Sequence, residues 1–143
     1  NDIGPEGAVA IAGAMQENST VTRLDVSGNH IANEGAAAFA LVLEKSTTLK
    51  ILSLSQNCIG AEGGEKLAAA LEKNAALTKL LLMGNDLGDT GAEALIAALE
   101  KNRTLCGVDL AYNRVKAPVM ERLGAALTRN AAAQLPLGES PDV

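Results

Sequence analysis

The sequence predicts an α/β solenoid, an open horseshoe arc with a parallel sheet on its concave face and helices on its convex face. Three columns of like residues, whose members stand 28 positions apart, predict this architecture. They are the asparagines Asn29, Asn57, Asn85 and Asn113, the glycines Gly7, Gly35, Gly63 and Gly91, and the apolar residues Met15, Leu43, Leu71, Leu99 and Leu127. Self-similarity at one fixed period is typical of a stacked array, in which each unit buries its apolar side only against its neighbours.

The repeats define one predicted domain, residues 1–132, followed by a tail. The domain consists of a partial repeat, 1–20, and the full repeats 21–48, 49–76, 77–104 and 105–132. The partial repeat has no strand of its own, which leaves a sheet edge unpaired and favours a fragment of a longer array. A further strand would place Ala133, Pro136 and Gly138 at its leucine positions, so residues 133–143 are predicted to form a disordered C-terminal tail.

Each full repeat is predicted to begin with a short strand. The four strands follow the spacing L-x-x-L-x-L-x-x-N and are centred near Leu24, Leu52, Leu80 and Val108. Successive side chains of a strand point to opposite faces of its sheet. The residues at the leucine positions are therefore expected in the core, and the residues between them on the concave face.

A helix is predicted after each strand, from about Gly35 to Lys45 in the first full repeat. In the next repeat, Leu67, Ala68 and Leu71 recur at helical spacing and give the helix one apolar stripe. An asparagine follows each of the last three helical stretches, where a left-handed residue often ends a helix. These asparagines are Asn74, Asn102 and Asn130.

The asparagine column at the strand ends is predicted to be structural. Where each strand turns inward, a buried amide can satisfy the backbone groups that the turn exposes. Its regular recurrence therefore needs no catalytic or ligand-binding explanation. The predicted structural ladder is Asn29, Asn57, Asn85 and Asn113.

The full pattern, L-x-x-L-x-L-x-x-N-x-[IL]-x-x-x-G followed by an alanine-rich helix, resembles the ribonuclease-inhibitor class of leucine-rich repeats over residues 1 to about 132. The uniform repeat length and the phrase Ile59-Gly60-Ala61-Glu62-Gly63 look most like the C-terminal repeats of cytosolic nucleotide-binding innate-immune receptors. Ran GTPase-activating protein and the C-terminal domain of tropomodulin share this architecture. The resemblance implies a curved recognition surface rather than a chemical reaction, and it names no partner.

The composition argues against nucleic acid and membranes as partners. The net charge of −5 and the absence of a basic run do not suit phosphate binding. Tyr112 and Phe39 are the only aromatic residues, so the chain has almost no side chains that could stack on nucleic-acid bases. No apolar run reaches the length that spans a bilayer.

The two cysteines, Cys58 and Cys106, lie in non-adjacent repeats and are predicted to be too far apart to form a disulfide. Two free thiols favour a reducing compartment, so a cytoplasmic location is predicted. Glycosylation sequons at Asn18 and Asn102 weigh against that location. Both sequons, however, coincide with the asparagine that follows a helix.

The residues offer little for catalysis, metal binding or a cofactor. His30 is the only histidine, it lies on a turn, and no residue of the sequence pattern orients it toward a nucleophile. No Cys/His cluster has the spacing of metal ligands, and the glycines recur once per repeat rather than in a phosphate-binding loop. The chain is therefore predicted to be no enzyme and to hold no metal or cofactor.

The concave face is the predicted binding surface, because the outward side chains of all four strands line it. Ile51, Leu81 and Met83 give it an apolar centre, and charged residues flank them. An apolar centre with a polar rim is typical of protein-binding surfaces. The predicted protein-binding residues are Arg23, Asp25, Ile51, Ser53, Lys79, Leu81, Met83, Asp109 and Tyr112.

The predicted function is a non-catalytic protein–protein interaction module that binds a protein partner on its concave face, as a fragment of a larger scaffold or receptor. Two alternatives stay open. One is a GTPase-activating protein of the Ran-regulator type, although that family carries functional loops that depart from the basic repeat. The other is a tropomodulin-like actin-end capping domain, whose divergent terminal repeat the segment Pro118 to Arg129 could mimic.

Overall fold

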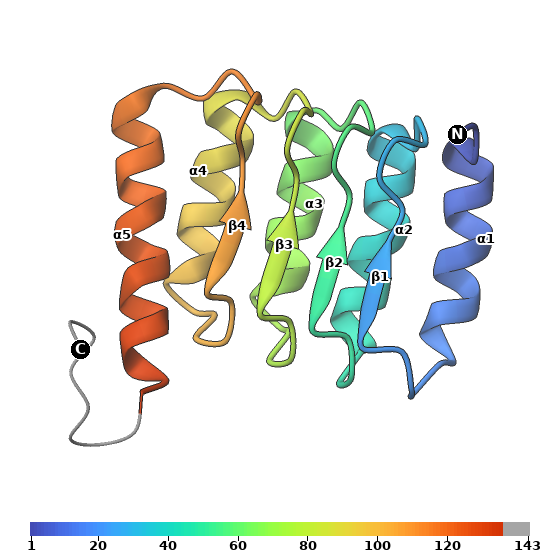
Figure 1. The fold of residues 1–143 in the computed structure, drawn as a ribbon, viewed down its shortest axis with the longest axis horizontal. Helices are drawn as coiled ribbons and strands as arrows, with labels where there is room; N and C mark the ends of the chain where they lie inside the picture. Colours follow the sequence, from blue (N-terminus) through green and yellow to red (C-terminus); the bar gives the residue numbers. More distant parts are fainter. Residues whose placement is uncertain (136–143) are drawn as a thin grey trace.

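The computed structural model of the chain describes residues 1–135, in which helices and short strands alternate from end to end (Figure 1). Each strand is three residues long, and the helices range from 11 to 17 residues. In chain order the elements are α1 (Gly4–Gln16), β1 (Arg23–Asp25), α2 (Ala32–Lys45), β2 (Ile51–Ser53), α3 (Ala61–Leu71), β3 (Lys79–Leu81), α4 (Gly88–Leu99), β4 (Gly107–Asp109) and α5 (Ala117–Ala133).

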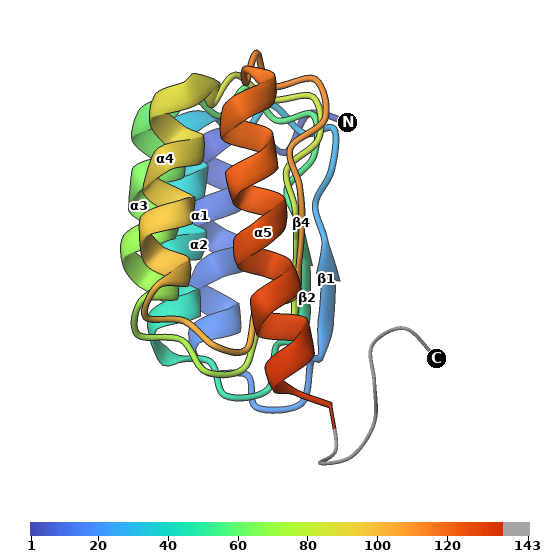
Figure 2. The ribbon, with the colours of Figure 1, turned by 90° about the vertical axis from the view of Figure 1, so that its left-hand side faces the viewer.

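The four strands form one parallel sheet in the order β1-β2-β3-β4. In register across the sheet stand Leu24, Leu52, Leu80 and Val108, the centres that the sequence predicted. The five helices of residues 1–135 all lie on one side of the sheet, and none of them covers the opposite face (Figure 2). The predicted α/β repeat solenoid, with the sheet and the helices in separate layers, is confirmed.

The helices of the full repeats begin earlier than predicted. Helix α2 starts at Ala32 rather than near Gly35, because the backbone N–H of Gly35 already donates to the carbonyl of Ile31 at 2.9 Å. The N–H of Gly91 likewise donates to Leu87 O at 3.1 Å, and α4 starts at Gly88. The glycine column therefore lies inside the first helical turn instead of marking its start.

Small residues bring neighbouring helices close together. A Cβ on Gly64 of α3 would lie only 3.3 Å from the Cα of Gly91 in α4, and 3.0 Å from Cδ2 of Leu87. Such contacts leave no room for larger side chains, so the backbones of α3 and α4 approach each other directly. Further from the sheet edge, Leu71 and Leu99 are almost fully buried between the stacked helices.

The predicted asparagine ladder is present as a series of hydrogen bonds between repeats. Asn57 is fully buried, and its Oδ1 accepts the backbone N–H of Asn29 in the preceding repeat at 2.8 Å. Its Nδ2 donates to the carbonyls of Val26 and Ser55, at 3.0 and 3.1 Å. Asn85 repeats the pattern, with its Oδ1 2.9 Å from the N–H of Asn57. Each rung therefore joins one repeat to the one before it.

A second asparagine ladder lies at the other end of the helices, where the sequence predicted only helix-ending residues. The backbone φ of Asn74, Asn102 and Asn130 is not positive, so the left-handed conformation expected for them is wrong. These three side chains are buried instead, and each Nδ2 donates across to the preceding repeat. The Nδ2 of Asn102, for example, donates to the carbonyls of Leu71 and Asn74 at 2.8 and 2.9 Å.

The last helix, α5, runs to Ala133, one residue beyond the expected end of the fourth full repeat. After it, the side-chain amide of Gln134 donates to the carbonyls of Arg103 and Thr104, both at 3.0 Å. The first residues of the predicted tail are thus held against the preceding turn. The rest of the predicted tail, residues 136–143, lies outside the described residues. Within residues 1–135, every helix is too short or too polar to cross a membrane.

Candidate functional site

The concave face of the sheet presents side chains from all four strands in rows that follow the register. One row is Arg23, Ile51, Lys79 and Gly107, and the next is Asp25, Ser53, Leu81 and Asp109. Since adjacent strands lie about 4.8 Å apart, neighbouring members of a row are close enough to act on one ligand. The parallel register therefore brings together most of the residues predicted to bind a partner.

The apolar centre of this face is half-buried rather than fully exposed. Ile51, Leu81 and Met83 all have intermediate exposure. The aliphatic stem of Lys79 adds to this surface, since a Cβ on Gly107 would lie 3.2 Å from its Cγ. The centre thus consists of three apolar side chains and the methylene groups of a lysine, whose ammonium remains exposed.

The two predicted acidic flanks are engaged in local turns. Asp25 Oδ1 accepts the backbone N–H of Ser27 at 2.9 Å and its hydroxyl at 2.6 Å. These hydrogen bonds hold the pKa of Asp25 below its ordinary value of 3.8. Asp109 Oδ1 accepts the N–H of Ala111 at 3.0 Å in the equivalent turn. Both carboxylates therefore shape the end of their own strand.

Ser53 differs from the prediction, because it is only 7% exposed. Its hydroxyl lies 2.7 Å from the hydroxyl of Ser27, across the boundary between β1 and β2. Ser27 is in turn bonded to Asp25, so the three side chains form one hydrogen-bonded cluster on the concave face. Ser53 thus supports the surface and offers a partner little contact area of its own.

The turn after each strand has a left-handed residue at the same place in every repeat. The backbone φ is +69° at Gly28, +55° at Gln56, +71° at Gly84 and +57° at Tyr112. Sequence reasoning identified Tyr112 as a binding residue at the rim but missed this shared conformation. The signal was present, since glycine occupies two of the four equivalent positions.

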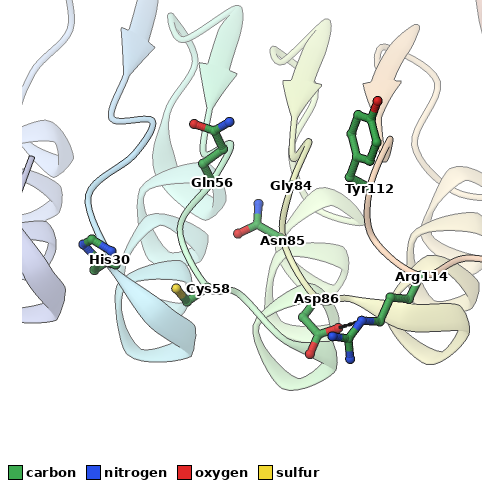
Figure 3. Close-up of a pocket in the computed structure, with 8 residues that line it drawn as sticks. All are labelled: His30, Gln56, Cys58, Gly84, Asn85, Asp86, Tyr112 and Arg114. Carbon is green, nitrogen blue, oxygen red and sulfur yellow. Dashed lines mark ion pairs between the residues drawn. The ribbon is translucent and has the colours of Figure 1, made fainter.

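These turns border an open depression at the rim of the concave face, with a volume of about 600 Å³. It draws on all four full repeats (Figure 3). Its lining residues are His30, Gln56, Cys58, Gly84, Asn85, Asp86, Tyr112 and Arg114. Tyr112 is 84% exposed, and Arg114 Nε lies 3.4 Å from Asp86 Oδ1 in an exposed ion pair.

A thiol and an imidazole are among the side chains that line this depression. Cys58 is an exposed thiol, and Cys106 is a half-buried thiol elsewhere; neither forms a disulfide. His30 Nδ1 lies 3.6 Å from the exposed carboxylate of Asp2, at the far end of the depression. In the part of the chain that the structure describes, no three His, Cys, Asp or Glu side chains are grouped to hold a metal ion.

The repeats match a known protein family. A family model described as Leucine Rich repeat matches residues 1–12, 17–40, 45–68 and 73–96, which together make up more than half of the chain. The repeat 105–132 falls outside these segments. No curated protein sequence matches the chain.

Two solved structures have the same architecture. Actin-Binding Site 2 of leiomodin-1 is 22% identical and has a TM-score of 0.82, over 94% of this chain and 81% of that one. The tropomodulin C-terminal domain from Caenorhabditis elegans is 14% identical and has a TM-score of 0.57, over 90% of this chain and 94% of that one. At these identities the likeness shows a shared fold.

Proposed function

Because the chain belongs to the leucine-rich repeat family, we propose that it is a non-catalytic module that binds a protein partner on its concave face. One observation carries the proposal. The sheet face opposite the helices has no covering element within residues 1–135, and it combines a half-buried apolar centre with exposed polar neighbours. This combination is what protein interfaces use, with an apolar core that excludes water and a polar rim.

Leu81, Met83 and Ile51 are the proposed energetic centre of this interface, with Tyr112 at its rim. Apolar and aromatic side chains that become desolvated in a complex carry most of its affinity. Arg23 and Lys79 are exposed on the same face and are proposed to adjust the association rate and its salt dependence. Asp25 and Asp109 contribute to the surface mainly by fixing the turns beside it.

Actin is a second, more specific candidate for the partner. The support is the likeness to Actin-Binding Site 2 of leiomodin-1, which extends over 94% of this chain at a TM-score of 0.82. The hypothesis of a tropomodulin-like capping domain also points to actin, so actin is the first partner to test. The alternative of a GTPase-activating protein predicts that the chain speeds GTP hydrolysis by Ran. We expect no acceleration in that assay.

The finer family placement rests on the repeat spacing. The L-x-x-L-x-L-x-x-N pattern with a uniform period supports the ribonuclease-inhibitor class and a likeness to the repeats of nucleotide-binding immune receptors. A cytoplasmic location is supported by the two unpaired thiols, which suit a reducing compartment. The sequon at Asn102 weighs less against it than the sequence implied, because that side chain is 2% exposed and fully hydrogen-bonded.

The concave face is tested with a pair of matched substitutions. Leu81→Asp places a charge in the proposed interface, and Leu41→Asp makes the same change on the convex side of α2, where Leu41 is 50% exposed. Binding of monomeric actin is measured by sedimentation velocity, and capture from native lysate is measured for other partners. Leu81→Asp is expected to abolish binding with little change in thermal unfolding, whereas Leu41→Asp retains it. The opposite result would place the binding surface on the helices.

A further inference from the structure

Four segments of the chain, each leading from a helix into the next strand, form the lower edge of the array in Figure 1. They are residues 18–24, 46–52, 74–80 and 102–108, and together we call them the strand-start edge. None of them contains an aspartate or a glutamate, although the chain has 17 acidic residues. The cations of this edge are Arg23, Lys50, Lys79 and Arg103. In a chain with a net charge of −5, this edge is therefore a local cationic region.

Backbone hydrogen bonds place three of these cations on adjacent strands. The N–H of Lys50 donates to the carbonyl of Thr22, next to Arg23, at 2.7 Å. The carbonyl of Lys50 accepts the N–H of Lys79 at 3.1 Å. The backbone of Lys50 thus lies between those of the other two cations, whose strands are about 10 Å apart. We call Arg23, Lys50 and Lys79 the basic row.

The charge of the basic row is not neutralised by direct contacts. Its three side chains are exposed, and within residues 1–135 none of them forms an ion pair. Other cations of the chain do, as Lys101 does with Glu72 at 3.3 Å. The carboxylate nearest to the row along the chain, Asp25, accepts hydrogen bonds from Ser27 at 2.9 and 2.6 Å instead. The row therefore presents positive charge to a partner.

The basic row borders the apolar centre of the proposed binding face. Lys79 and Leu81 lie two positions apart on β3, so they face the same side of the sheet, about 6.6 Å from each other. Arg23 pairs with Ile51 across β1 and β2. A partner that contacts the apolar centre therefore brings its neighbouring residues over the row.

We propose that the basic row binds a carboxylate-rich segment of the protein partner, next to the partner residues that contact the apolar centre. This inference rests on the proposed function and names the chemistry of the segment that lies over the strand-start edge. Charge complementarity carries it, because the unpaired cations stand together on one edge of the binding face.

The donors of the row suit carboxylates. The guanidinium of Arg23 can bind a carboxylate through two hydrogen bonds, and the lysines add point charges on long, flexible stems. The exposed hydroxyl of Thr22 adds one more donor. Alternate side chains of an extended segment are about 6.7 Å apart. Two carboxylates at that spacing therefore fit a row that spans about 10 Å.

The surrounding charge limits the length of this segment. Asp25 and Asp109 lie on the same face, one row further along the strands. That separation is about 6.6 Å, which is less than the screening length of about 8 Å at physiological ionic strength. A long polyanion such as a nucleic acid would overlap these carboxylates and be repelled by them. A short acidic segment fits the row without that repulsion.

The ligand class is tested by amide NMR titration with blocked tripeptides. N-acetyl-Glu-Ala-Glu-amide is expected to shift the amides of residues 23, 50 and 79, with a dissociation constant on the order of millimolar at about 0.01 M salt. The shifts are expected to vanish at about 1 M salt, because the screening length falls from about 30 Å to about 3 Å. The uncharged Gln-Ala-Gln peptide and the cationic Lys-Ala-Lys peptide are expected to leave these amides in place.

Lys50→Glu and Lys66→Glu form a matched pair of variants. Both lysines are exposed and form no ion pair within residues 1–135, and both substitutions change the net charge equally. Lys66 lies in α3, on the helical side of the array. Lys50→Glu is expected to weaken binding of the glutamate peptide about 5-fold or more, whereas Lys66→Glu keeps it within about 2-fold. Amide shifts away from the substituted residue check that both variants are folded.

Three results would overturn the proposal. They are equal shifts with the glutamine peptide, equal weakening in Lys66→Glu, and a short oligothymidine that shifts the amides of the basic row more than the glutamate peptide does. All three are read from small probes and do not depend on a protein partner. The proposed function fails separately, when Leu81→Asp leaves protein binding intact.

Discussion

Asn57→Ala is the substitution that best tests how the repeats are joined. Oδ1 of Asn57 accepts the backbone N–H groups of Asn29 and Ile31, at 2.8 and 3.4 Å. Its Nδ2 donates to the carbonyls of Val26 and Ser55, which also accept other hydrogen bonds. Alanine would therefore strand two buried N–H groups. At about 1–3 kcal/mol for each unsatisfied group, the expected loss of stability is about 2–6 kcal/mol.

The same reasoning predicts unequal losses along the ladder. Asn85 Oδ1 also accepts two buried N–H groups, at 2.9 and 3.0 Å, so Asn85→Ala is expected to match Asn57→Ala. Within residues 1–135, Asn113 Oδ1 accepts one N–H, that of Leu87 at 3.1 Å, so Asn113→Ala is expected to lower the stability by about 1–3 kcal/mol. Asn29 Oδ1 accepts a single long bond of 3.4 Å, so Asn29→Ala is expected to cost least.

The losses are measured by urea unfolding followed by far-ultraviolet circular dichroism, with the free energy of unfolding taken from the midpoint at constant slope. Asn18→Ala is the control, because Asn18 is exposed and water can replace its bonds to Thr20 and Val21. Its effect is expected to stay within about 0.5 kcal/mol. Equal losses in Asn57→Ala and Asn29→Ala would refute the reasoning from stranded N–H groups.

Three further predictions concern the core, the thiols and pH. Leu71→Ala is expected to cost about 2–5 kcal/mol in urea unfolding, because Leu71 is 1% exposed between stacked helices; a loss below about 1 kcal/mol would contradict that. Thiol titration of the unreduced, denatured protein is expected to count both Cys58 and Cys106 as free groups, and a lower count would contradict the unpaired state. The lowered pKa of Asp25 stabilises the fold at pH above 3.8, and this contribution is lost as pH falls through the folded-state value. The stability difference between the protein and Asp25→Asn should therefore shrink in acid, and a difference that grows in acid would contradict the Ser27 contacts as its cause.

The fold was predictable because the period of the sequence also encodes the register of the sheet. Once Leu24 and Leu52 occupy the same position in successive units, stacking the units pairs them, and the structure shows this pairing. The pairing of Ile51 with Lys79 follows the same period, and the alternation along each strand indicates which side chains face away from the helices. Repeats make long-range contacts local, since each unit meets only its neighbours.

The detailed state of the surface was not predictable from the period. Whether Ser53 is exposed depends on the serine that stands across from it, and on the carboxylate that orients that serine. The start of α2 was placed too late, because the first turn forms from backbone bonds that carry no apolar signature. Asn74 was given a local role, since periodicity says where a residue recurs and not which repeat its side chain reaches.

The left-handed turns show a subtler limit. Gly28 and Gly84 carried the signal, but Gln56 and Tyr112 between and after them concealed that the position is a single column. The sequence indicates a shared left-handed conformation only at the repeats that have glycine at this position. Where another residue occupies the position, the structure is needed to show its left-handed conformation.

The close approach of Gly64 to Gly91 also influences the curvature of the array where α3 meets α4. The strand layer and the helix layer are joined along their length but differ in the spacing of their elements. The array therefore bends toward the layer with the smaller spacing, which is the sheet. With strands about 4.8 Å apart, layers about 10 Å apart and helices spaced between about 8 and 10 Å, each repeat bends by about 18° to 30°. Glycine at these contacts favours the lower limit and therefore a gentle bend. A larger side chain at this contact would push α3 and α4 apart and increase the bend between their repeats. The strand side chains on the proposed binding face would then move closer together, although the substitution lies on the helical side of the array.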